Sequence, residues 1–214
     1  MTEAAVATVT ALALTAAVVL LHGGLTGTPP PRPPADQARP RAAGPAAAPL
    51  PRARPDRVRI PALRVDAPLT GLGLTPDGHL DPPPPGRADL AGWYADGTAP
   101  GERGTAILAG HVDTATGPGV FYRLGALRRG RTVAVDRADG STAVFRVDAI
   151  GVYRADDFPD ERVYGAATRP ELRLITCGGP YSSGTGYRAN VVVFAHLTGR
   201  APRPSALTAV SSAR

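Results

Sequence analysis

The chain has 214 residues and a formal net charge of +6, with 24 basic residues that are all Arg and a single cysteine. One cysteine excludes a framework of intrachain disulfides. The 24 Pro and 25 Gly residues, beside only 5% aromatics, exclude a packed core along the whole length. The length allows one domain of ordinary size or two small ones.

The positive charge belongs to the two flanks of the chain. Residues 1–59 hold seven Arg and three acidic residues, and residues 200–214 hold three Arg and no acidic residue. Residues 60–199 hold fourteen Arg and fifteen acidic residues, which leaves a net charge of −1. Nucleic-acid binding requires a basic face with interleaved aromatic side chains, so we expect no nucleic-acid partner.

The first element in chain order is an uncharged apolar run from Ala4 to Leu21. As a helix it would be about 27 Å long, close to the hydrocarbon thickness of a bilayer. Three interpretations stay open: a membrane anchor, a cleaved signal peptide and a buried helix. We favour residues 1–28 as the anchor of a single-pass membrane protein. The Arg residues that follow the run would instead favour a cytoplasmic C-terminal side.

Residues 29–56 are rich in Pro and Arg, with ten prolines between Pro29 and Pro55. Such a segment has little apolar surface to bury and favours an extended polyproline conformation. We predict an extracellular linker that holds the following domain away from the membrane. Residues 57–199 form the predicted domain, and residues 200–214 are predicted to be a disordered tail.

The predicted domain contains seven or eight short strands separated by Gly, Pro and Asp. Asp139-Gly140 is a strong hairpin signal between two alternating runs. Residues 120–127 predict one or two helical turns. This pattern indicates an all-β fold, a closed or nearly closed β-barrel. The clearest strands are 58–60, 65–69, 105–109, 132–135, 143–147, 172–176 and 191–195.

Cys177 follows the predicted strand 172–176 and precedes two glycines. A lone cysteine is usually a small buried hydrophobic residue. In an exported protein, however, an unpaired thiol without a function is exposed to oxidation, and this favours a chemical role for Cys177. A cysteine nucleophile needs a base, and His111 at the end of strand 105–109 is the best placed of four histidines. His22 and His79 are poor candidates, and a structural role suits His196.

Acyl transfer also needs a group that stabilises the oxyanion. Arg188 is the only arginine between Cys177 and the end of the last strand. A guanidinium stays charged and offers a planar set of donors, although an ordinary surface charge is the simpler interpretation.

These residues resemble the sortase family of cysteine transpeptidases over residues 57–197. The matching pieces are Ala106-Ile107-Leu108-Ala109-Gly110-His111, Leu174-Ile175-Thr176-Cys177 and Arg188. Residues 58–63 and 92–94 resemble the actinobacterial class F, with class E as the alternative. The resemblance implies an eight-stranded β-barrel with one or two short helices, acting as a monomer without a cofactor.

The resemblance also implies a reaction and its partners. Cys177 would cleave an LPxTG-like sorting signal of a secreted protein between Thr and Gly and form a thioester, which an amine of peptidoglycan or its precursor would resolve. His111 would exchange protons with the two amines and Arg188 would bind the oxyanion. Thr176, Ile175 and Ala109 would contact the substrate.

Two departures from the family pattern and two rivals remain. Counting back from Ala195, the catalytic Arg of some members would fall at Asn190, two residues after Arg188. Some members bind calcium through loop carboxylates, but a solvated acidic loop is the simpler interpretation of Asp156, Asp157, Asp160 and Glu161, so we expect no metal.

An L,D-transpeptidase would place Gly before Cys, where this chain has Thr176. A non-catalytic, wall-binding module would not depend on Cys177.

Overall fold

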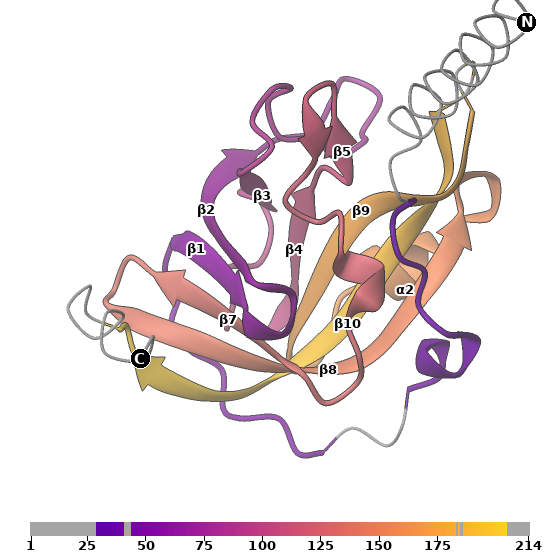
Figure 1. Ribbon diagram of the computed structural model, residues 1–214. Coiled ribbons are helices and arrows are strands. Elements are labelled where there is room, and N and C mark those ends of the chain that lie inside the picture. The colour runs from indigo at the N-terminus through magenta and orange to yellow at the C-terminus, as the bar shows by residue number, and fades with distance from the viewer. Residues whose placement is uncertain (1–28, 41–43, 183, 185, 205–214) are drawn as a thin grey trace, which may run out of the picture.

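The computed structural model describes residues 29–40, 44–182, 184 and 186–204 (Figure 1). The predicted anchor at residues 1–28 lies outside these residues, as does most of the predicted tail. Within the described ranges, no helix is long and apolar enough to cross a membrane.

Eight strands form a closed barrel in the order β1-β2-β3-β4-β9-β10-β8-β7 (Figure 1). The β2–β3 and β4–β9 pairs are parallel and the other pairs are antiparallel. This confirms the predicted all-β, eight-stranded barrel. The strands are β1 (Pro55–Ile60), β2 (Val65–Leu72), β3 (Ala91–Tyr94), β4 (Gly104–Gly110), β5 (Asp113–Thr114), β6 (Gly117–Pro118), β7 (Thr132–Arg137), β8 (Ser141–Arg154), β9 (Pro170–Ser182) and β10 (Gly186–Pro202).

Helical structure is confined to short turns. The described residues form one α-helix and four 3-10 helices, and the predicted turns at 120–127 contain one of the latter, η3. The helices are η1 (Ala35–Ala38), η2 (Pro61–Leu63), η3 (Leu124–Ala126), η4 (Ala155–Asp157) and α2 (Asp160–Tyr164).

The predicted Asp139-Gly140 turn joins β7 to β8, and Gly140 has a φ of +75°, which glycine adopts without steric cost. The strand β10 continues to Pro202, whose partner on β8 is Ser141. The last strand therefore extends three residues beyond 199, the predicted end of the domain.

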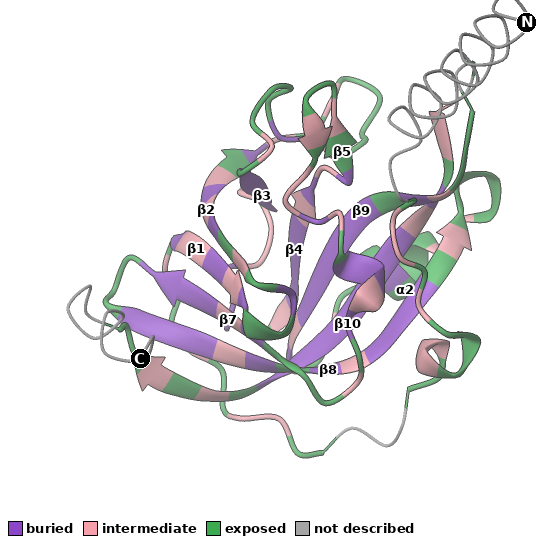
Figure 2. Ribbon diagram, viewed as in Figure 1, coloured by how far each residue is buried: buried purple, intermediate pink, exposed green. Residues whose placement is uncertain are grey.

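The strands β9 and β10 are buried on both faces over their central part (Figure 2). Alternation sends Leu172 and Leu174 into the barrel core and leaves Ile175 on the outer face. On that outer face, Val192 and Phe194 of β10 pack with Val163 of α2. The chain between β8 and β9 therefore covers the outside of the sheet and gives it a second, smaller apolar cluster.

The Pro-rich segment contacts the barrel instead of standing free of it. The Arg129 guanidinium donates to the carbonyl oxygens of Asp36 and Arg39, at 2.6 and 2.7 Å, and its backbone N–H donates to the Gln37 side chain. Further along, the backbone N–H of Leu50 donates to Gly101 O at 2.8 Å. The sequence predicts an extended spacer here. In an extended proline-rich segment the carbonyl oxygens have no internal hydrogen-bond partners, so they can accept hydrogen bonds from the barrel. The composition alone does not reveal that contact.

Arg129→Ala should release the segment around η1 without disturbing the barrel. We expect hydrogen–deuterium exchange of the amides in residues 35–38 to accelerate at least about fivefold, because charge-assisted hydrogen bonds that hold the segment are lost. The matched control is Arg128→Ala, since the Arg128 side chain donates only to the nearby carbonyls of Ala126 and Leu127. Equal exchange in the two variants would show that Arg129 does not hold the segment.

Candidate active site

Cys177 lies within β9, with its side chain on the outer face of the sheet. Its strand partner on β10 is Asn190. The strand does not end at Cys177, as the sequence pattern suggests, but continues to Ser182 as a two-stranded ribbon with β10. Cys177 is exposed, so the sulfur can be approached from solvent.

Steric constraints explain the two glycines that follow Cys177. A Cβ at Gly178 would lie 2.8 Å from Cγ2 of Val191, and a Cβ at Gly179 would lie 2.8 Å from Cβ of Ala189. Gly179 also has a φ of +80°, where the β9–β10 register shifts by one residue. The glycines therefore let β10 pack closely beside the nucleophile.

His111 follows the last residue of β4 and makes two hydrogen bonds. Its backbone carbonyl accepts from the N–H of Phe121 at 3.0 Å, and its Nε2 lies 2.8 Å from the carbonyl oxygen of Pro83. The buried Thr176 hydroxyl donates to the carbonyl oxygen of Gly110, the residue before His111, at 2.8 Å. The last bond ties the end of β4 to the residue that precedes Cys177, so His111 and Cys177 are positioned together.

Cys177 and His111 line the same small cavity of about 230 Å³. Its wall also includes the three residues that the sequence predicts to contact substrate: Ala109, Ile175 and Thr176. Because the Thr176 hydroxyl donates its proton to Gly110 O inside the protein, it does not donate to a ligand in the cavity.

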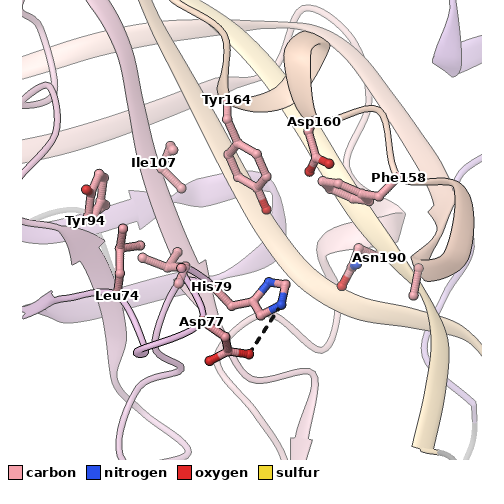
Figure 3. Close-up of a pocket in the computed structure, with 12 residues that line it drawn as sticks. Leu74, Asp77, His79, Tyr94, Ile107, Phe158, Asp160, Tyr164 and Asn190 are labelled. Atoms are coloured by element: carbon pink, nitrogen blue, oxygen red, sulfur yellow. Dashed lines mark ion pairs between the residues drawn. The ribbon is translucent and has the colours of Figure 1, made fainter.

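The small cavity adjoins a larger one of about 720 Å³, and the two share His79, Leu80, Tyr164 and Asn190 as lining residues. Figure 3 shows Asp77 and His79 on one side of the larger cavity and Tyr164 and Asn190 on the other. Its other apolar lining residues include Leu74, Tyr94, Ile107, Ala155 and Phe158. Together the two cavities form a groove between the loop at residues 73–90 and the segment at residues 155–164.

Arg188 does not line either described cavity, whereas Asn190 lines both. Arg188 is exposed and precedes Asn190 by two residues on β10, where the β9–β10 register shifts between Tyr187 and Ala189. The pKa of the Asp156 carboxyl is lowered, mainly by its hydrogen bond from Arg154 and least by the charge of Arg188. Arg188 is thus close to Asp156, at the outer margin of the groove.

The chain matches the Sortase domain family model over residues 58–198. The chain belongs to the sortase family. It is therefore a cysteine transpeptidase of the class that sorts proteins to the cell wall. Cys177 is the one cysteine of the sequence, so it is the candidate nucleophile for this chemistry.

Solved sortase structures share the fold. The SrtA sortase of Actinomyces oris matches 77% of this chain and 93% of its own, with 20% identity and a TM-score of 0.53. Sortase C of Streptococcus pneumoniae matches 70% of this chain and 69% of its own, with 21% identity and a TM-score of 0.53. No curated protein sequence matches the chain.

The acidic residues between β8 and β9 are dispersed. Asp156 pairs with Arg154, and Asp160 lines the larger cavity. Across the described ranges, no group of three or more His, Cys, Asp or Glu side chains is placed to hold a metal ion.

His196, to which the sequence assigns a structural role, is buried and lies with Nδ1 2.7 Å from Asp148. The position of His79 differs from the prediction. The sequence pattern makes it a poor candidate, yet it lines both cavities of the sortase groove, with Nε2 3.5 Å from Asp77. The length of its loop, residues 73–90, is the one available signal, since loops longer than about 12–15 residues are often functional.

Asp113 is a second residue that the sequence pattern does not single out. Its carboxylate accepts a hydrogen bond from the Tyr187 hydroxyl, which links the chain after His111 to β10. The pKa of the Cys177 thiol is raised, first by partial burial and second by the negative charge of Asp113. The raised pKa favours the protonated thiol at neutral pH, so its reaction requires a base.

Asp113→Asn should make the free thiol more reactive near neutral pH. Removing the negative charge lowers the pKa of Cys177, so a larger fraction is thiolate, which is the nucleophilic form. We expect alkylation by iodoacetamide at pH 7 to accelerate on the order of two- to fivefold, and its pH profile to shift to lower pH. Tyr187→Phe is the control that keeps the charge. An unchanged profile in Asp113→Asn would contradict the electrostatic role.

Proposed function

We propose that this sortase cleaves an LPxTG-like sorting signal between Thr and Gly and transfers the acyl group to an amine of peptidoglycan or its precursor. The observation that carries the proposal is that Cys177 and His111 line one small cavity that opens into a larger apolar groove. The substrates would be secreted proteins with a C-terminal sorting signal.

The reaction has two balanced steps. In the first, Cys177 Sγ attacks the Thr carbonyl carbon, and its proton passes to His111. The S–C bond forms, the C–N bond to Gly breaks, and the leaving Gly amine takes the proton from His111. In the second, the acceptor amine attacks the thioester, and its proton returns through His111 to the sulfur as the C–S bond breaks.

Arg188 is the proposed oxyanion residue. Arg188 lies two residues before Asn190, the strand partner of Cys177, and its long side chain would extend toward the sulfur when substrate binds. Arg188 is exposed, and no described ion pair engages its guanidinium, so it is free to turn toward Cys177. Asn190 is the direct strand partner of Cys177, and its side-chain amide would supply a second, uncharged donor.

The groove suits the apolar beginning of such a signal. Ile107 and Ile175 lie on the outer face of the sheet, and Tyr94 and Phe158 pack against the same apolar cluster. Burying an apolar side chain there is favourable by about 25 cal/mol per Å². The scissile Thr–Gly bond would then reach the smaller cavity, where Ala109 leaves space beside the sulfur.

The proposal for the cellular location rests on the sequence. Residues 1–28 would anchor the protein in the cell membrane as a single pass, with the catalytic domain extracellular and monomeric. The segments at residues 58–63 and 92–94 favour an actinobacterial class F enzyme over class E. Both segments contribute to barrel strands, β1 and β3.

Incubation with labelled LPxTG-like peptides, without an amine acceptor, should give a thioester adduct detected by intact-mass spectrometry. Cys177→Ala should give none. We expect Arg188→Lys to slow adduct formation on the order of a hundredfold, because one oxyanion donor group is worth about that factor, and Asn190→Ala to slow it less. A wild-type enzyme that forms no adduct with any such peptide would contradict the proposed reaction. Full activity of Arg188→Lys would contradict only the bidentate oxyanion role.

A non-catalytic, wall-binding module is the remaining alternative, and the same experiment separates it. Such a module would bind wall material equally well as wild type and as Cys177→Ala, and neither would form a thioester. The close fit of β10 around Gly178 and Gly179, which keeps the sulfur accessible, favours catalysis.

A further inference from the structure

The loop between β2 and β3 contains four consecutive prolines beside the active site. Residues 81–85 read Asp-Pro-Pro-Pro-Pro, and we refer to them as the proline strap. Asp81, Pro82 and Pro83 line the small cavity together with Cys177 and His111. At the start of the strap the backbone N–H of Asp81 donates to Gly73 O, and at its end the backbone N–H of Arg87 donates to Pro84 O in a turn.

Pro83 is the residue of the strap that is turned toward the site. It is buried, whereas the prolines on either side of it, Pro82 and Pro84, are exposed, as is Pro85. The pyrrolidine ring fixes φ at each of these residues, so the strap has few conformations available. Its carbonyl oxygen, 2.8 Å from Nε2 of His111, is therefore held in a defined position.

A carbonyl oxygen can only accept a hydrogen bond, so the Nε2 atom that faces Pro83 must carry the hydrogen. The hydrogen bond made by one ring nitrogen of a histidine determines which nitrogen is protonated. In the neutral ring, Nδ1 then carries the lone pair. Prolines have no N–H, so residues 82–85 offer no donor of their own that could compete for the Pro83 carbonyl.

We propose that Pro83 is the positioning residue of His111: its carbonyl holds Nε2–H, so that Nδ1 is the ring nitrogen that exchanges protons during transpeptidation. The inference rests on the proposed function. Nδ1 takes the thiol proton from Cys177, delivers it to the leaving Gly amine, takes a proton from the acceptor amine and returns it to the sulfur. The hydrogen stays on Nε2 and is donated to Pro83 O throughout, so a backbone carbonyl orients the ring as a carboxylate does in a Ser-His-Asp triad.

The tautomer of His111 can be measured without any substrate. The full chain is labelled with ¹⁵N-histidine, and two-bond ¹H–¹⁵N correlations are recorded at a pH where the ring is neutral. Comparison with His111→Gln assigns the resonance among the four histidines. We expect the Nε2-protonated form in the free enzyme. Protonation at Nδ1 would overturn the proposal and leave the proposed reaction untouched.

Pro83→Gly tests the strap itself, with Pro85→Gly as the matched control. Both variants add the same backbone freedom, but Pro85 is exposed and does not line the small cavity. We expect Pro83→Gly to show both His111 tautomers and to form the Cys177 thioester on the order of tenfold more slowly, a part of what acid–base catalysis supplies. Pro85→Gly should match the wild type in both measurements.

Two results of this comparison would overturn the proposal. One is a Pro83→Gly variant with the wild-type tautomer and the wild-type rate. The other is a faster Pro83→Gly variant, since that would make the strap an obstacle to His111 instead of its support. Equal thermal unfolding of the two glycine variants would verify that both are folded.

Discussion

The parallel pairing of β4 and β9 is the interaction on which the active site depends. The register sets Ala109 beside Ile175, so that the residues just beyond this pair, His111 on one strand and Cys177 on the other, lie at the same edge of the sheet. The Thr176 hydroxyl fastens the two strand ends through Gly110 O, a buried hydrogen bond worth about 1 kcal/mol. If β9 paired with β4 one residue out of this register, the Cys177 side chain would point into the barrel and the Thr176 side chain would point outward.

The rest of the site follows from covering the outer face of this sheet. Ile175 and Phe194 are apolar on that face, and the chain between β8 and β9 returns across it with Val163. The loop at residues 73–90 approaches from the other side, and the space left between them is the groove. The covering segments thus have two effects, since they bury the outer apolar cluster and they shape a binding site that leads to the nucleophile.

The sequence predicts the barrel and the shared site of Cys177 and His111 because both leave local signals. Alternation, the Asp139-Gly140 turn, the isolated Cys177 and the strand-end His111 can each be recognised within a few residues. The residues that complete the groove leave no such signal. Asn190 faces Cys177 only through the β9–β10 register, and Pro83 meets His111 only because a long loop folds back over the sheet. The docking of the Pro-rich segment on Arg129 is likewise a tertiary effect that its composition conceals.

The most direct test of the account is a crystal structure of the full chain with an LPxT-like peptide coupled through its C-terminal carbonyl analogue to Cys177. We predict that the peptide lies in the groove over Ile107 and Ile175, with its carbonyl oxygen in reach of Arg188 or Asn190 and its apolar end near Phe158. A peptide that leaves this groove empty and runs along the opposite face of the β9–β10 ribbon, beside Tyr187, would contradict it.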